Sequence, residues 1–339
     1  MSQSSLGDDA SRLPIKPPEP VLSWQPIEPG PGTRKPVVAS HATAGRDLSA
    51  EDLRSPRRRR IVLPVFLFAA TCFSTFLAGA LDWNPGYYLE SSRQSDQLLA
   101  ANWRQGLIYM AAVIGILLTH EMGHFLQAVR YGVPASLPYF IPVPVLMTGT
   151  MGAVIGMEGS RADRKQLFDI GLSGPVAGLI VALPIIWFGI KTATAMSPTA
   201  EFQLGDPLIF KLMASYLRPD IPDNALLNKH NPLLMAGWVG MLITGLNMLP
   251  ISQLDGGHVI YGLFGRRAHL VARAFLVVAI AFIVLGDHYN WTLMLVLVIL
   301  LGVDHPATRD DDVPLGFWRR AIGLLSLGIP VLCFTPVLL

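Results

Sequence analysis

Residues 106–124 read GLIYMAAVIGILLTHEMGH, an apolar run that carries no charge until it ends in the pattern HExxH. An ionisable side chain in a membrane-spanning helix is costly, so three within five positions indicate a functional site. On a helix, His120 and His124 lie one turn apart on the same face, which allows two imidazoles to bind one metal ion. Glu121 lies beside that metal position, where it could take a proton from a water molecule. We therefore interpret the rest of the chain as the scaffold of this site.

The apolar composition indicates a membrane protein. Of the 339 residues, 51% are hydrophobic and 15% are charged, whereas soluble domains carry about 25% charged residues. Two cysteines, far apart in the sequence, are too few for a cysteine-based metal site. The recurring apolar runs predict an all-α polytopic fold with about seven transmembrane helices. They are expected at residues 61–81, 106–127, 168–190, 234–250, 270–286, 291–303 and 320–338.

The chain before the first span differs in character from the rest. Residues 1–60 are rich in proline, serine and charge and lack periodicity, which predicts a disordered tail. We expect two domains, this tail and a membrane-embedded domain at residues 61–339. Residues 57–60 are four arginines directly before the first span, so the positive-inside rule places the N-terminus in the cytoplasm.

An apolar segment broken by prolines follows the HExxH helix. Residues 137–146 contain three prolines and cannot form a spanning helix, and residues 149–158 are β-prone with glycines at turn-like positions. Irregular backbone at membrane depth is tolerated only where it lines a cavity or is buried in protein. We therefore expect a membrane-embedded loop resembling a β-hairpin beside the metal. An ordinary interfacial loop is the alternative.

The third expected span begins with a series of small residues. Gly171, Gly174 and Gly178 recur along it, and small residues allow helices to approach one another closely. We interpret these glycines as packing residues. Asp169 lies at the expected cytoplasmic edge of this span, so we expect it to cap the helix N-terminus.

A catalytic zinc site usually has three protein ligands, and HExxH supplies two. The metzincin class requires glycine at position 127 and a third histidine at position 130. The chain has Gln127 and Arg130, which excludes that class. The third ligand must therefore come from another helix.

Asp255 is the candidate for this third ligand. It follows the expected span 234–250, which crosses in the same direction as the HExxH helix and so reaches the same membrane face. Pro250 would break that helix and let the chain turn toward the metal. Gly256 and Gly257 permit close backbone approach. The alternative is that Asp255 is a structural turn residue.

Two further patterns complete a known combination. Residues 247–250 read Asn-Met-Leu-Pro and residues 254–256 read Leu-Asp-Gly. Together with HExxH they resemble the site-2 protease family of intramembrane zinc metalloproteases. The resemblance covers most of residues 106–267, the expected catalytic core, and includes the Gly-Pro pair at 174–175. It implies one zinc ion per chain, bound by His120, His124 and Asp255, and it makes Glu121 the general base.

The resemblance also implies roles in substrate binding. Asn247 matches the asparagine thought to stabilise the oxyanion in that family, although a helix-packing amide is the alternative. The 137–158 region resembles the loop that receives substrate as an added strand. We interpret His258 as structural. The expected substrate-binding residues are Gly149, Thr150, Met151, Gly152, Ala153 and Val154.

The implied function is intramembrane proteolysis, with hydrolysis of peptide bonds in or near transmembrane segments. The expected partners are the lipid bilayer and single-pass, pre-cleaved membrane proteins, with no nucleic acid. The expected location is a bacterial cell membrane, with the active site toward the cytoplasm. A catalytically inactive scaffold of the same fold is one alternative, against which the intact Glu121 argues weakly. A metal-dependent transporter is the other, but the charged residues scattered over several spans and the inverted repeat that it predicts are not seen.

Overall fold

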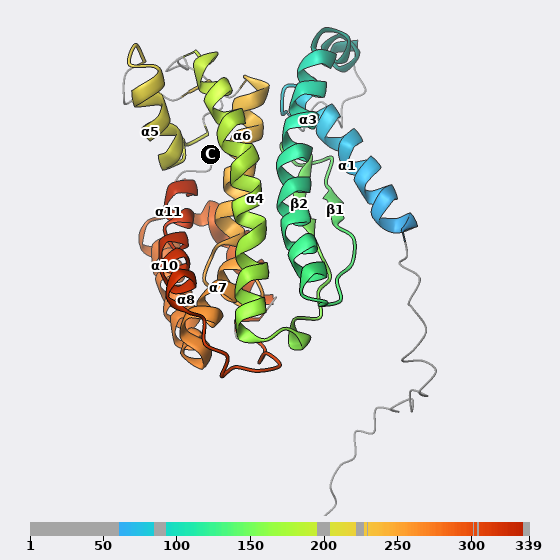
Figure 1. Ribbon diagram of the computed structural model, residues 1–339. Helices are drawn as coiled ribbons and strands as arrows, with labels where there is room; N and C mark the ends of the chain where they lie inside the picture. The colour runs from blue at the N-terminus through green and yellow to red at the C-terminus, as the bar shows by residue number, and fades with distance from the viewer. Residues whose placement is uncertain are drawn as a thin grey trace, which may run out of the picture. The chain divides into compact units, whose positions relative to one another are not determined.

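The computed structural model describes residues 61–84, 93–194, 204–221, 227, 228, 230–300, 302, 303 and 305–334. The expected disordered tail at residues 1–60 lies outside these described residues. The described part is mainly helical and contains one small two-stranded sheet (Figure 1).

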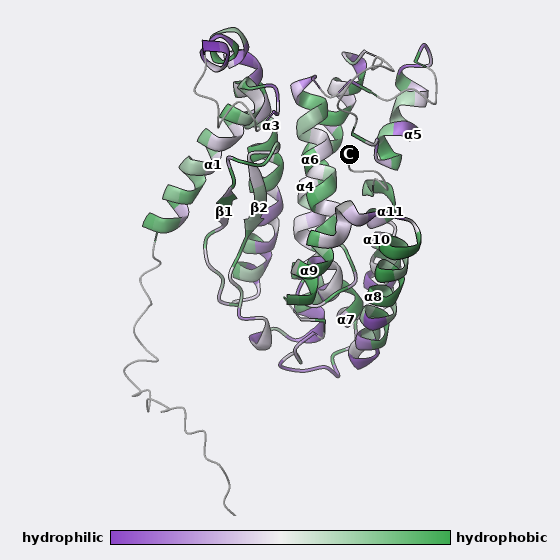
Figure 2. Ribbon diagram, turned by 180° about the vertical axis from the view of Figure 1, so that it is seen from behind, coloured by the Kyte–Doolittle hydropathy of each residue, from purple (hydrophilic) through white to green (hydrophobic). Residues whose placement is uncertain are grey.

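Four helical segments of the described chain are long and apolar enough to cross a membrane. Apolar residues predominate along the first of them, α1 (Figure 2). The last segment consists of two helices, α7 and α8, that meet at Gly265, where the backbone has a φ of +58°. The four are α1 (Val62–Ala80), α3 (Arg93–Arg130), α4 (Arg164–Lys191) and Asp255–Leu285, which comprises α7 (Asp255–Phe264), η2 (Gly265–Arg267) and α8 (Ala268–Leu285).

The expected count of seven spans is not confirmed. Residues 234–250 and 291–303 correspond to helices of 16 and nine residues, which reach only ~24 and ~14 Å, short of a hydrocarbon core about 30 Å thick. The described part of the expected span 320–338, which ends at residue 334, lies in two short helices, because Gly328 and Pro330 interrupt the apolar run. The shorter helices are α5 (Leu208–Leu217), α6 (Pro232–Asn247), α9 (Thr292–Leu300), α10 (Phe317–Ser326) and α11 (Ile329–Cys333), with 3-10 turns η1 (Gly159–Arg161) and η3 (Tyr289–Trp291).

Helix α3 is the centre of the packing. It lies between α1 and α4 and also contacts α6 (Figure 1). Glycine allows the close contact with α1, because a Cβ at Gly106 would lie 2.6 Å from the carbonyl oxygen of Phe76. The largest core cluster includes Tyr109, Val113, Ile116, Ile186, Trp238 and Val239. This packing places the HExxH half of α3 against α4.

The expected β-hairpin is present after α3. Strands β1 (Tyr139–Pro142) and β2 (Thr150–Val154) pair in antiparallel fashion, with an irregularity between Phe140 and Pro142. The Ser74 hydroxyl of α1 donates a hydrogen bond of 2.7 Å to the Gly149 carbonyl oxygen. The Tyr109 hydroxyl of α3 donates one of 2.8 Å to the Thr148 carbonyl oxygen. The hairpin is therefore attached to both helices.

The N-terminus of α4 corrects one expectation. Asp163 is the N-cap, and its carboxylate accepts a hydrogen bond from the Gln166 backbone N–H at 2.8 Å. Asp169 lies within the helix, where it pairs with Arg319 at 2.7 Å and accepts a hydrogen bond from the Tyr131 hydroxyl. The prediction that Asp169 caps the helix is therefore wrong, because an earlier aspartate takes that position and Asp169 joins α4 to α10.

An ion pair joins the end of α1 to the start of α6. Asp82 accepts hydrogen bonds from His230 Nδ1 at 2.8 Å and from Gln105 Nε2 at 3.2 Å. The hydrogen bond to Asp82 raises the pKa of His230, against the opposing effect of burial. Burial favours a higher pKa for Asp82, but the hydrogen bond and charge of His230 outweigh it, so the pKa of Asp82 is lowered.

These shifts predict how the pair depends on pH. The raised pKa of His230 stabilises the fold below about pH 6.5, and this contribution is lost as the pH rises through the folded-state value. The lowered pKa of Asp82 stabilises the fold above about pH 3.9, and this contribution is lost as the pH falls. We expect His230→Gln to lower the thermal midpoint by about 1–2 °C near pH 5.5 and to leave it unchanged near pH 9. Equal losses at both pH values would contradict this assignment.

Candidate metal centre

His120 and His124 face the same direction in the C-terminal half of α3. Both are buried, with 2% and 5% of their surface exposed. Their Nε2 atoms lie 3.3 Å apart, as expected for histidines one helical turn apart. The pair offers two adjacent nitrogen ligands.

Asp255 completes the group from a different helix. It is the first residue of α7, with Oδ2 3.1 Å from His120 Nε2 and Oδ1 3.2 Å from His124 Nε2. One ligand atom from each of the three residues can be chosen so that all lie within 4.8 Å of one another. The structure thus brings together the three residues that the sequence singled out. Two imidazole nitrogens and a carboxylate oxygen are a donor set that suits zinc.

The turn between α6 and α7 brings Asp255 into place. A Cβ at Gly256 would lie 2.1 Å from the Met248 carbonyl oxygen, and one at Gly257 would lie 2.1 Å from the Ser252 carbonyl oxygen. Only glycine permits so close an approach of the backbone. The expected role of this glycine pair is therefore confirmed.

The orientation of His124 depends on α4. Its Nδ1 lies 2.7 Å from the Ile170 carbonyl oxygen, which can only accept a hydrogen bond. Nδ1 therefore carries the proton, and the lone pair of Nε2 faces His120 and Asp255. A hydrogen bond of this kind behind a histidine ligand fixes the ring and its tautomer. No sequence pattern indicates this role of Ile170, because any residue type supplies a backbone carbonyl.

The glycines of α4 make room for the imidazoles. A Cβ at Gly174 would lie 2.0 Å from His124 Nε2, and one at Gly178 would lie 3.1 Å from His120 Nδ1. A Cβ at Gly171 would lie 2.6 Å from His258 Cβ. The predicted packing role of these glycines is confirmed, and the residues that they accommodate belong to the metal group or adjoin it.

Glu121 and Asn247 border the group. Glu121 follows His120 directly and is 4% exposed. Asn247 is the last residue of α6, and its Nδ2 lies 3.5 Å from His120 Nε2. Asn247 therefore lies next to the metal-binding candidates, and the Glu121 carboxylate is close enough to His124 and Asp255 to interact with them electrostatically. The chemical roles of both residues belong to the proposal below.

The expected substrate-binding residues lie on and just before strand β2. Met151 and Val154 are 48% and 52% exposed, and the residues between them are buried. A Cβ at Gly152 would lie 3.5 Å from the Ile243 side chain, so β2 lies close to α6, the helix that ends in Asn247. The role of these residues in substrate binding stays a prediction.

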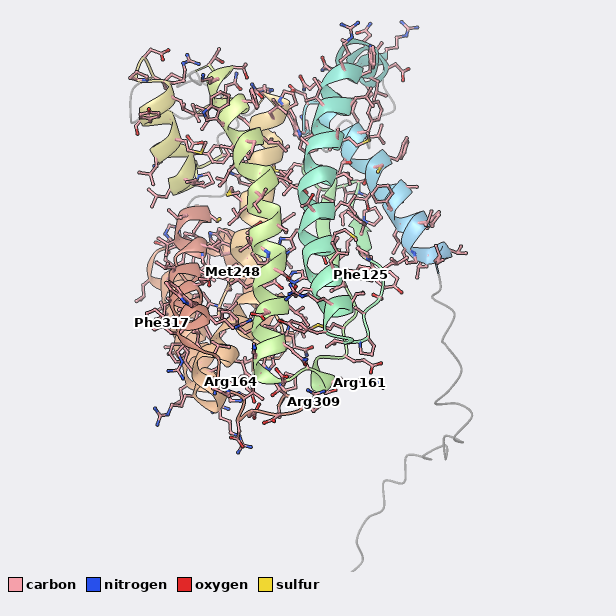
Figure 3. The ribbon with its side chains drawn as sticks, in the orientation of Figure 1. Phe125, Arg161, Arg164, Met248, Arg309 and Phe317 are labelled. Carbon is pink, nitrogen blue, oxygen red and sulfur yellow. The ribbon has the colours of Figure 1, made fainter. Side chains whose placement is uncertain are left out.

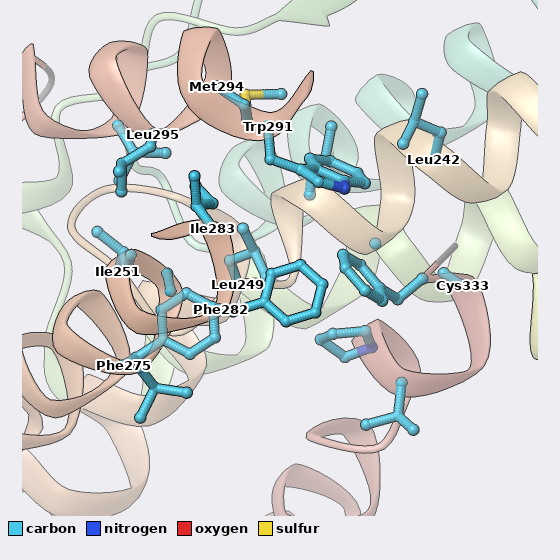
Figure 4. A pocket seen from close by; sticks show the side chains of 18 residues that line it. Leu242, Leu249, Ile251, Phe275, Phe282, Ile283, Trp291, Met294, Leu295 and Cys333 are labelled. Atoms are coloured by element: carbon cyan, nitrogen blue, oxygen red, sulfur yellow. The ribbon is translucent and has the colours of Figure 1, made fainter. Parts of the chain in front are cut away.

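A separate cavity of about 350 Å³ lies among α6, α8, α9 and α11 (Figure 4). Its lining includes Leu249, Phe282, Trp291 and Cys333 and contains no charged residue. None of the three metal-binding candidates lines it, and neither does Glu121. The cavity is therefore separate from the candidate metal group.

The apolar helices and the His-His-Asp group define a class of protein, a membrane protein with a metal centre between its helices. Residues 108–286 match the model of peptidase family M50, and the chain belongs to this family. The resemblance to the site-2 proteases is thereby confirmed.

Curated relatives agree with this assignment. The chain is 34% identical over 233 residues to "Probable zinc metalloprotease EGY1, chloroplastic" of Arabidopsis thaliana, which covers 66% of this chain and 42% of the relative. It is 31% identical over 250 residues to the EGY1 protein of Oryza sativa subsp. japonica, covering 71% of this chain and 42% of the relative. An EGY3 protein of Oryza sativa subsp. indica is 28% identical over 299 residues, and this match covers 82% of this chain and 49% of the relative.

The chain thus spans less than half the length of these relatives. Their names place them in chloroplasts, so they give no support to the expected bacterial cell membrane. No solved structure matches the chain.

Proposed function

We propose that this chain is an intramembrane zinc metalloprotease, which hydrolyses peptide bonds in or near transmembrane segments of other membrane proteins. One observation carries the proposal: the ligand atoms of His120, His124 and Asp255 lie within 4.8 Å of one another, and Glu121 directly follows the first of them. Membership of peptidase family M50 supports it. We place the catalytic core within residues 106–267 of a membrane domain at residues 61–339.

The residues around the metal group divide the reaction between them. When bound, a zinc ion supplies a Lewis acid and makes water a competent nucleophile near neutral pH. Glu121 takes one proton from the attacking water, whose oxygen forms the new bond to the peptide carbon. Glu121 then delivers this proton to the leaving amine as the C–N bond breaks. Asn247 donates a hydrogen bond to the oxyanion through Nδ2. Its position 3.5 Å from His120 Nε2 supports this role.

The position of both histidines on α3, which is long and apolar enough to cross a membrane, supports an intramembrane reaction. The peptide bonds of a helical substrate are hydrogen-bonded within the helix, so the substrate must unwind locally before it is cut. Strand β2 (Thr150–Val154), together with Gly149 just before it, then binds the unwound segment as an added strand. The exposed side chains of Met151 and Val154 give this strand a surface for contact. The substrates are single-pass membrane proteins that have already been cleaved once.

We infer a topology with the N-terminus in the cytoplasm and the active site toward that face, and the four arginines at residues 57–60 support it.

The transporter alternative finds less support. In the described chain, the His-His-Asp set is the one group of three or more metal-ligating residues close enough to share an ion, whereas an ion pathway needs several sites along the membrane.

Removal of the metal tests the proposal directly. We expect a chelator to abolish cleavage of a reconstituted single-pass substrate, because the attacking water is not activated when the zinc ion is removed. Readdition of about one equivalent of zinc should restore cleavage, as measured by gel assay together with metal analysis. Cleavage that continues in the metal-free protein would exclude this function.

A further inference from the structure

A second contact network holds helix α7, which begins with Asp255. It is formed by residues 305–312, which we call the strap and which lie between α9 and α10. The backbone N–H of Arg309 donates to the Ala162 carbonyl oxygen at 2.9 Å. The backbone N–H of Arg164 donates to the Asp310 carbonyl oxygen at 3.1 Å. Figure 3 shows Arg164 and Arg309 near each other at the N-terminal end of α4. The strap is thus tied to the start of α4.

A pair of imidazoles links the strap to α7. His258, one turn after Asp255, has its Nδ1 2.7 Å from His305 Nε2. His305 Nδ1 lies 2.5 Å from the Pro306 carbonyl oxygen, which can only accept, so this nitrogen carries the proton of the neutral ring. His305 Nε2 is therefore the acceptor and His258 Nδ1 the donor. His305 is only 8% exposed, so its hydrogen bond is sheltered from water.

Three further contacts hold α7 and the turn before it around this pair. The Tyr261 ring stacks on His305 with centroids 4.4 Å apart, and its hydroxyl donates to Asp311 Oδ2 at 2.9 Å. In the turn before α7, the Ser252 backbone N–H donates to the Val303 carbonyl oxygen at 3.2 Å. Ser252 has a φ of +51°, a conformation that persists only where neighbours hold it. The start of α7 is therefore held on both sides of Asp255.

Helix α4 contacts both helix α7, which carries Asp255, and His124 of α3. Arg164 at its start donates to the Gly262 carbonyl oxygen from Nε at 2.8 Å and to the Leu263 carbonyl oxygen from Nη2 at 3.1 Å. These carbonyls belong to the C-terminal end of α7. Further along α4, the Ile170 carbonyl oxygen orients His124. Asp255 and His124 are therefore both positioned with respect to α4.

We propose that His305 is a positioning residue for the metal centre, which acts through its hydrogen bond with His258 to hold the Asp255 carboxylate against His120 and His124. This inference rests on the proposed zinc site. The structural role expected of His258 is then to connect His305 to the start of α7. The strap is then part of the metal-binding apparatus, although it contributes no ligand.

Two polar substitutions separate the hydrogen bond from packing. In His305→Gln the amide oxygen takes the place of Nε2 and can still accept from His258. In His305→Asn the amide takes the place of Nδ1, and His258 loses its acceptor. We expect the asparagine variant of the full chain to bind zinc about tenfold more weakly and the glutamine variant to bind it almost as well as wild type. Zinc affinity is measured by competition with a coloured chelator, and the visible spectrum of the cobalt-loaded protein reports the ligand geometry.

The matched control is His288→Asn. His288 also stacks on an aromatic ring, that of Phe282, with a centroid distance of 4.3 Å and an interplanar angle of 23°. The corresponding angle for His305 on Tyr261 is 25°. Since His288 lies outside the strap, its substitution should leave zinc affinity and the cobalt spectrum unchanged.

Two variants of the other member of the hydrogen bond, His258 on α7, test the inference if His305→Asn does not fold. His258→Asn keeps a donor at the position of Nδ1 and should bind zinc normally, whereas His258→Gln loses it and should bind weakly. Equal affinity of the asparagine and glutamine variants at either position overturns the inference. Asp255→Ala separates the two proposals: if it alone loses zinc, the positioning role fails, and if it binds zinc like wild type, the proposed metal site fails as well.

Discussion

Replacing Glu121 with glutamine is expected to lower the rate of peptide cleavage on the order of 10³-fold while the protein keeps its zinc. The amide has nearly the same shape as the carboxylate but cannot take a proton from water. Glu121 is not one of the three residues that converge on the metal position, so metal binding should not depend on it. Measuring cleavage and zinc content on the same preparation distinguishes loss of the base from loss of the ion.

The control for this variant is Asp96→Asn. Asp96 is an exposed residue in the first turn of α3, at the opposite end of the helix from the HExxH residues. The same change from carboxylate to amide there should leave cleavage within experimental error of wild type. If Glu121→Gln cleaves as fast as Asp96→Asn, Glu121 is not the general base.

Sequence patterns within a single segment predicted those elements whose structure depends mainly on their own residues. The HExxH helix follows from its apolar run, and the hairpin follows from the prolines and glycines between residues 137 and 158. The number of spans was not predicted correctly, because hydropathy detects an apolar stretch whether or not it forms one continuous helix. At residues 320–338 the composition suits a span, but Gly328 and Pro330 divide it into two helices.

In the metal group, the three candidate ligands were predicted from the sequence, whereas their hydrogen-bond partners were not. His120 and His124 are predicted by helical periodicity alone, and Asp255 by the direction of its span together with the glycines that follow it. The groups that orient them were not predicted. Ile170 acts through its backbone carbonyl, and His258 is paired with His305, which lies 47 positions later in a segment without periodicity. Contacts of this kind depend on tertiary structure, and a single sequence does not show them.

Replacing Gly174 with alanine is expected to reduce zinc affinity by about 100-fold or more, although glycine is not a ligand. The new Cβ would lie 2.0 Å from His124 Nε2 and 2.3 Å from its Cδ2, so the imidazole would have to move. Helices α3 and α4 pack closely here, since a Cβ at Gly123 would lie 2.6 Å from the Ser173 carbonyl oxygen of α4, and moving them apart would lose this contact. A displaced ring loses its hydrogen bond to Ile170 and its position beside Asp255.

Two other glycines turn this expectation into a graded series. Alanine in place of Gly178 would lie 3.1 Å from His120 Nδ1, which requires a smaller shift and predicts an intermediate loss of zinc affinity. Alanine in place of Gly115, in the same helix as the histidines, would meet nothing within 4 Å and should leave zinc binding unchanged. Alanine favours a helix over glycine by about 1 kcal/mol at each position, so helix propensity cannot explain a loss of metal. Equal zinc affinities of the Gly174, Gly178 and Gly115 variants would show that space beside the imidazoles does not limit the site.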